Sequence, residues 1–226
     1  MAGTAGRMKT AAIGQDRTRA RLWAEFVTIF GLAPVAVAVA LPASAMFPAL
    51  AAVTALGLYL LWRTPGFRWA GLLRGRVRWG EVALFAALCM AVSWAVVQAT
   101  APRALFGLIH YDTMLWLMVM AFYPILSALP QELVFRPLFF RRYGQLLPGQ
   151  RAAVVLNAAL FSLAHLMYWN WIVAVMTFFG GLAFAHAYEV RRSFPQAVVM
   201  HAVAGWVLFS IGLGMFFYTG NVTRPF

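Results

Sequence analysis

The sequence predicts an all-α membrane protein, a polytopic bundle of about seven transmembrane helices. Of the 226 residues, 63% are hydrophobic and only 11% are charged, whereas a soluble domain is about half apolar and one quarter charged. The apolar residues are gathered in long runs, and a helix needs ~20 of them to span a bilayer. Since the chain shows no linker and no internal repeat, we expect residues 22–226 to form one membrane-embedded domain behind a basic tail, residues 1–21.

Seven apolar runs are separated by basic, proline-containing or glycine-containing stretches. The first, at about 22–41, is too long for the apolar core of a cleaved signal peptide and is read as an uncleaved span. The others are expected at about 45–62, 81–97, 113–143, 152–169, 171–190 and 195–218. The stretch 63–78 mixes arginines with Phe67, Trp69 and Leu72, which is typical of an amphipathic segment on the inner leaflet.

The positive charges predict the orientation. If the N-terminus lies inside and the helices alternate, 16 of the 18 lysines and arginines fall on the inner side, and only Arg103 and Arg224 fall outside. Loops on the cytoplasmic side carry such an excess, so we expect a cytoplasmic N-terminus and an external C-terminus. The net charge of +12 is then a consequence of topology, and no nucleic-acid partner is expected.

One acidic residue, Glu132, lies deep within an apolar run. If the fourth helix continues past Pro130 to Tyr143, Glu132 is about 16 Å from its end at 1.5 Å per residue, near the bilayer midplane. Arg136 follows at i+4, where the two side chains can pair on one helix face. A carboxylate at that depth is a functional-site candidate by default. The alternative is a helix that ends at Pro130 and leaves 131–142 in a wet loop.

Two histidines lie within later apolar runs, His165 in the fifth and His201 in the seventh. Each belongs to an i, i+4 pair, Phe161 with His165 and His201 with Gly205. A lone histidine on an apolar helix is more often a core residue than a catalyst, but three such pairs on three runs are a more specific signal. The distances of the two histidines along their runs differ by about 12 Å, so a tilt, a kink or a re-entrant loop would have to bring them level.

These motifs resemble those of the CPBP family of intramembrane proteases, which includes the CAAX prenyl endopeptidase and the bacterial Abi proteins. The family pattern of EExxxR, FxxxH and HxxxN corresponds here to Gln131-Glu132-Leu-Val-Phe-Arg136, Phe161-Ser-Leu-Ala-His165 and His201-Ala-Val-Ala-Gly205. The resemblance covers about residues 113–215. It implies a metal-free glutamate endopeptidase whose catalytic residues are Glu132, His165 and His201. The supporting residues in these motifs are Gln131, Arg136, Phe161 and Gly205, and Asn157 from the fifth run is a further supporting candidate.

The chain departs from the family pattern at two positions. The first glutamate, usually taken as the base that activates water, is Gln131, and the final asparagine, thought to hold the oxyanion, is Gly205. Glu132 is then the one carboxylate available as a base. A backbone N–H, a water or Asn157 would have to replace the missing asparagine. The same departures favour a different interpretation, a catalytically silent family member that acts as a membrane scaffold or binding protein.

The expected substrate is a membrane-anchored protein or peptide whose C-terminal anchor is matured or sorted, a myxosortase-like role, in a bacterial inner membrane. No cofactor is expected. The alternative is a zinc ion held by Glu132, His165 and His201, with water in the fourth position. Against zinc stand the lack of an HExxH motif and the three separate helices that would supply the ligands. A small transporter would be expected to show inverted repeats, which the sequence lacks.

Overall fold

The computed structural model describes residues 16–225, and within that range it is helical without a strand. The helices of the described range that are long and apolar enough to cross a membrane are Asp16–Ala40, Trp79–Thr100, Thr113–Arg142, Gln150–Tyr168, Trp171–Val190 and Phe194–Ile211. A shorter apolar helix, α3 (Met46–Trp62), completes the bundle. The predicted polytopic helical bundle is confirmed.

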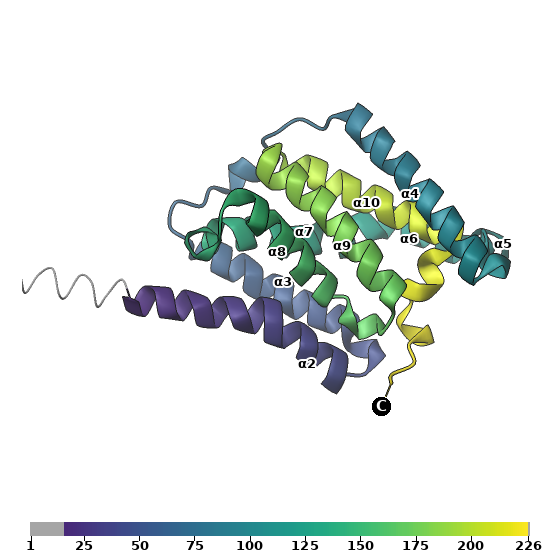
Figure 1. Ribbon diagram of the computed structural model, residues 1–226, viewed down its shortest axis with the longest axis horizontal. Helices are drawn as coiled ribbons and strands as arrows, with labels where there is room; N and C mark the ends of the chain where they lie inside the picture. Colours follow the sequence, from purple (N-terminus) through teal and green to yellow (C-terminus); the bar gives the residue numbers. More distant parts are fainter. Residues whose placement is uncertain (1–15, 226) are drawn as a thin grey trace, which may run out of the picture.

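Three helices form the centre of the molecule: α8 (Gln150–Leu163), α9 (Trp171–Ala185) and α10 (Phe194–Ile211) (Figure 1). At one edge α4 (Trp79–Thr100) packs along α10, and at the opposite edge lies the N-terminal helix, which ends in α2 (Ala33–Ala40). The outer helix α4 leaves large apolar side chains exposed. Those side chains include Leu84, Leu88 and Trp94. Exposed apolar surface on this scale is that of a protein surrounded by lipid.

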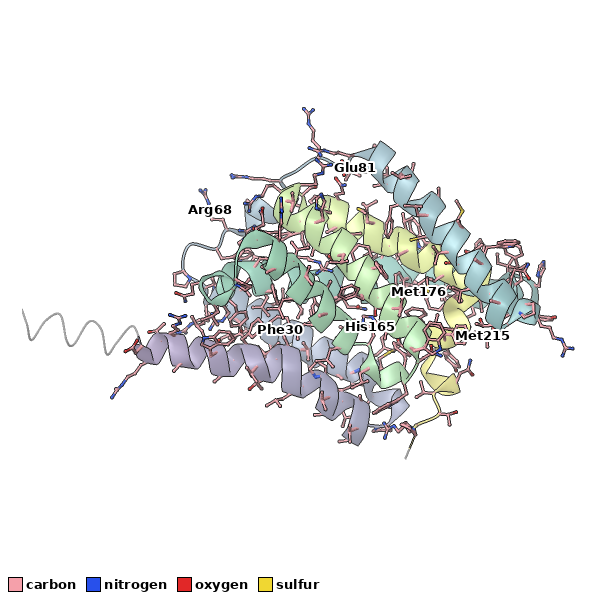
Figure 2. The ribbon with its side chains drawn as sticks, viewed as in Figure 1. Phe30, Arg68, Glu81, His165, Met176 and Met215 are labelled. Atoms are coloured by element: carbon pink, nitrogen blue, oxygen red, sulfur yellow. The ribbon has the colours of Figure 1, made fainter. Side chains whose placement is uncertain are left out.

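The N-terminal helix is fixed to the bundle by rings and by one ion pair. Phe30 packs edge-on against Phe135 and Phe139, at centroid distances of 5.5 and 5.3 Å, and it faces the other helices in Figure 2. At the other end, Arg142 donates from Nε and Nη2 to Oε2 of Glu25, at 2.8 and 2.7 Å. These contacts hold the first helix against the end of the fourth span.

The fourth span is one continuous helix from Thr113 to Arg142. It consists of α6 (Thr113–Tyr123), the π-helical η5 (Pro124–Ala128), α7 (Leu129–Leu133) and the π-helical η6 (Val134–Arg142). Pro124 opens the first π-helical stretch and Pro137 lies inside the second. A proline lacks the N–H donor and its ring crowds the preceding turn, which the wider π-helical turn accommodates. The helix therefore passes Pro130, and the wet-loop alternative is wrong.

Three boundaries differ from the predicted ones. The first helix begins at Asp16, so residues 16–21 of the predicted tail are helical; residues 1–15 lie outside the described residues. The stretch 63–78 contains only a short 3-10 helix, Trp69–Leu73, with no buried residue, because Pro65 and three glycines interrupt a longer helix. The last span ends at Ile211, where Gly212 adopts φ 120°.

Gly212 ends that span for a steric reason as well as a conformational one. Only glycine adopts such a positive φ without strain, and a Cβ at this position would overlap the backbone oxygen of Ala104. The loop before α5 (Gly107–Tyr111) therefore packs closely against the end of α10.

The arrangement of the ends supports a topology test. Arg136 lies inside the bundle, which leaves 15 basic residues on the predicted inner side and two on the outer side. We expect a reporter fused after Phe226 to be active only outside the cytoplasm, because seven helices separate the two termini. A reporter fused at Gly144 should be active only inside, because Gly144 follows the fourth of these helices. Two fusions that report the same compartment would contradict the seven-helix topology.

Candidate active site

Glu132 and Arg136 form a buried ion pair within the fourth span. Arg136 Nε donates to Glu132 Oε2 at 2.7 Å, and Nη2 donates to Oε1 at 3.2 Å. Neither side chain has exposed surface. Removing a carboxylate from water is costly unless it is paired and hydrogen-bonded, and the guanidinium supplies two parallel donors for that purpose. The pairing predicted from the i, i+4 spacing is present.

Asn157, on α8, holds the far side of the arginine. Its Oδ1 accepts a hydrogen bond from Arg136 Nη1, and its Nδ2 donates to the carbonyl of Phe135 at 2.7 Å. The guanidinium also lies over the ring of Phe161, 5.2 Å from its centroid. Both ends of the Asn157 amide are occupied, so this side chain positions Arg136 and is not available to a substrate.

His201, on α10, contacts Glu132 directly. Its Nδ1 lies 2.9 Å from Glu132 Oε1, and its ring stacks on Phe184 with a centroid distance of 4.8 Å and an interplanar angle of 12°. A carboxylate paired with an arginine can only accept, so Nδ1 carries the hydrogen and Nε2 has the free lone pair. The carboxylate thus fixes both the orientation and the tautomer of His201.

His165 lies just past the end of α8, which stops at Leu163, and Figure 2 places it inside the molecule at that helix end. Its Nδ1 is 2.7 Å from the carbonyl oxygen of Phe161, so here too Nδ1 donates and Nε2 is free. The Phe161 ring lies between the two histidines, 4.7 Å from His165 and 5.6 Å from His201. The three sequence motifs therefore meet around Phe161, although His165 itself has no contact with Glu132 as close as that of His201.

A cavity of about 420 Å³ borders His165. Its polar lining consists of Ser162, His165 and Asn170, and its remaining walls are apolar or aromatic, including Trp169 and Trp171. The chain leaves the α8 helix at His165, with φ −96° and ψ 6°. The imidazole therefore lines this cavity just past the end of the regular helix.

The three residues of the alternative zinc set have hydrogen-bond partners in the structure. Within residues 16–225 no group of three histidine, cysteine, aspartate or glutamate side chains could hold a metal ion. The Nδ1 atoms of His165 and His201 are committed to a carbonyl and to Glu132. The Glu132 carboxylate already accepts from Arg136 through both oxygens. These bonds leave Nε2 of each histidine free.

The two positions that depart from the family pattern also have defined surroundings. Gln131 donates from Nε2 to Ser127 Oγ at 2.9 Å. Gly205 is buried against the ring of Tyr123, and a Cβ on Gly205 would overlap the Cε1 and Cζ atoms of that ring. The sequence motifs did not single out Tyr123 or Ser127. The one available signal was their spacing, since 123, 127 and 131 follow each other at i+4 on the helix that carries Glu132.

The buried ion pair makes a stability prediction. Arg136→Met removes the counter-charge of Glu132 and strands a buried carboxylate, which we expect to lower the free energy of unfolding in detergent by roughly 3–5 kcal/mol. Arg68→Met is the matched control, because Arg68 is exposed, and it should change stability by no more than about 0.5 kcal/mol. Equal unfolding of the two variants would show that the pair contributes nothing to the fold.

Comparison with known proteins places this site in a family. Residues 113–207 match the family model described as type II CAAX prenyl endopeptidase Rce1-like. Neither a curated protein nor a solved structure matches the chain. The matched segment runs from the start of α6 into α10 and contains Glu132, His165 and His201. This segment carries a Rce1-like domain of the CPBP family, which supports a membrane-embedded peptidase.

Proposed function

We propose that the protein is an intramembrane endopeptidase in which Glu132 and His201 together activate the attacking water. The observation that carries this is the 2.9 Å contact between Glu132 Oε1 and His201 Nδ1, which joins residues 69 positions apart. Family membership supports peptidase activity within the membrane. The assignment of the acting groups, of the substrate and of the metal-free mechanism is our proposal.

The proton of the water is taken by the pair. The sequence predicted Glu132 itself as the base, but both of its oxygens accept from Arg136 and Oε1 accepts from His201 as well. The free basic atom of the pair is therefore His201 Nε2. When it takes a proton from water, the adjacent carboxylate stabilises the imidazolium that forms, and the same nitrogen can later return the proton to the leaving amine.

His165 has a different part in the proposal. Its Nδ1 is bonded to the carbonyl of Phe161, so Nε2 can accept a hydrogen bond from the water and hold it for attack, with the cavity of about 420 Å³ beside it. Before proton transfer neither histidine carries a hydrogen on Nε2, and the hydrogen that His201 gains is used for the leaving amine, so neither is assigned as the oxyanion donor. His201 therefore acts in this proposal as a base and not as the oxyanion donor.

The proposed substrate is a membrane-anchored protein with its scissile bond near a C-terminal anchor. A peptide bond must reach a site whose carboxylate is fully buried, and a segment already in the bilayer can approach through the mostly apolar cavity at His165. The resemblance to bacterial family members extends the proposal to sorting or maturation in a bacterial inner membrane. The bilayer is the second partner, and no nucleic acid takes part.

Glu132→Gln tests the proposed chemistry. We expect cleavage of a panel of anchor-segment reporters to fall by several orders of magnitude, because the amide cannot stabilise the imidazolium of His201. His201→Ala should cost about as much, and the double variant little more, since the two groups act as a unit. Cleavage would be measured in proteoliposomes, with circular dichroism to show that each variant keeps its helices.

Full activity of Glu132→Gln would refute the assigned chemistry. A second outcome separates the enzyme from a silent scaffold. If the wild type is inert toward every reporter and Gln131→Glu is active, the protein has lost its base and acts by binding. If the wild type is active, the second carboxylate of Gln131→Glu should lower the rate, because it places a like charge beside Glu132.

A metal-free site makes a separate prediction. We expect the purified protein to contain no stoichiometric zinc and to keep its cleavage rate after incubation with chelators, since the pair and not a metal activates the water. Elemental analysis and reporter cleavage are the measurements. Stoichiometric zinc that is lost in His165→Ala would instead establish a metallopeptidase.

A further inference from the structure

Hydrolysis at the proposed site needs a hydrogen-bond donor for the oxyanion, and the residues assigned so far do not provide one. The Nδ1 hydrogens of His165 and His201 point at Phe161 and Glu132. The amide of Asn157 is used at both ends. The position of the family's final asparagine is Gly205, which has no side chain.

The space beside Gly205 is filled by Tyr123. A Cβ on Gly205 would overlap the Tyr123 ring, so the aromatic side chain lies where a side chain at 205 would have to be. The same ring contacts His201 edge-on at a centroid distance of 6.0 Å. Tyr123 thus approaches the Glu132–His201 pair from α6, on the side that faces α10 at residue 205.

The hydroxyl end of Tyr123 faces the site. It lies within electrostatic range of Glu132 and of Tyr168, and Tyr168 stacks on His165 with a centroid distance of 6.1 Å and an interplanar angle of 22°. Tyr123 is only partly buried, in contrast to Glu132. Because the Tyr123 ring contacts His201, a substrate bound at His201 would lie beside this side chain.

A polar chain along one helix face positions the hydroxyl. Gln131 Nε2 can only donate, and it does so to Ser127 Oγ at 2.9 Å. The serine hydrogen is then available to the Tyr123 oxygen, with which Ser127 can interact, and the tyrosine keeps its own hydrogen for another acceptor. Donors arranged in series polarise each other. The neutral amide at 131, which cannot act as a base, has a role in this chain.

We propose that Tyr123 is a catalytic residue that donates its hydroxyl hydrogen to the oxyanion of the tetrahedral intermediate, with Ser127 and Gln131 as positioning residues. The inference rests on the proposed function. No covalent bond to Tyr123 forms, and its proton stays on its oxygen. The two departures from the family pattern are then one change: Gly205 makes room for the tyrosine, and Gln131 orients it through Ser127.

Tyr123→Phe is the primary test, because it keeps the ring against Gly205 and removes only the hydroxyl. We expect kcat on the anchor-segment reporters to fall about 100-fold or more, with KM nearly unchanged since the lost bond forms in the transition state. Thermal unfolding should match the wild type. Tyr59→Phe is the matched control, because Tyr59 is exposed on α3 and should keep the wild-type kcat.

A reciprocal exchange separates the hydroxyl from simple packing. Gly205→Asn alone should unfold at lower temperature, because the new side chain overlaps the Tyr123 ring. Combining it with Tyr123→Ala removes the overlap and supplies an amide donor in the same space. The double variant should therefore be more stable than Gly205→Asn and more active than Tyr123→Ala. A ring that only fills space would give recovered stability with no gain in kcat.

The outcomes distinguish this inference from the function on which it rests. If Glu132→Gln is inactive and Tyr123→Phe keeps the full wild-type kcat, the Tyr123 role is wrong and the proposed function stands. If Glu132→Gln is active, the proposed function fails first. Ser127→Ala should give a smaller loss of kcat than Tyr123→Phe. An equal or larger loss would contradict the assignment of Tyr123 as the donor and of Ser127 as a positioning residue.

Discussion

The buried carboxylate of Glu132 is the constraint on which the rest of the structure depends. A charged group at membrane depth is tolerated only with partners that compensate it, and here the partners come from three different helices. Arg136 follows on the same helix, Asn157 on α8 holds that arginine, and His201 on α10 donates to the carboxylate. The hydrogen bonds that compensate this one carboxylate thus link the fourth span to two central helices. They also hold His201 in the orientation that the proposed reaction requires.

Helix irregularity places these groups. The fourth span alternates between α-helical and π-helical turns, with Glu132 in the short α7 between η5 and η6. Each π-helical turn holds more residues than an α-helical turn and so rotates the side chains that follow it. Tyr123 precedes the first such stretch and Arg136 lies within the second. The prolines that favour these stretches are therefore part of how the site is built, and not merely tolerated in the membrane.

The sequence predicted the parts of the site that depend on local spacing. The Glu132–Arg136 pair follows from i, i+4 geometry on one helix, and the bundle follows from apolar runs. The approach of His201 to Glu132 was expected from the resemblance and not from helix geometry, because distances along straight helices placed the two histidines at different depths. Helix ends that depend on long-range contacts were also not predicted from the sequence. Gly212, for example, ends the last span where the chain packs against Ala104. Tyr123 belongs to no motif, and only its overlap with position 205 reveals it.

Those contacts explain why the two departures from the family pattern occur together. Any side chain at position 205 would collide with the Tyr123 ring, so an asparagine there and this tyrosine placement exclude each other. At position 131, a carboxylate would add a second negative charge next to Glu132, while the donors of Arg136 are already directed at Glu132 and Asn157. A neutral amide avoids that repulsion and can donate to Ser127. Glycine at 205 and glutamine at 131 are thus both consistent with the proposed site. In that site the hydroxyl of Tyr123 is the oxyanion donor, and neither a second acid nor an asparagine is present.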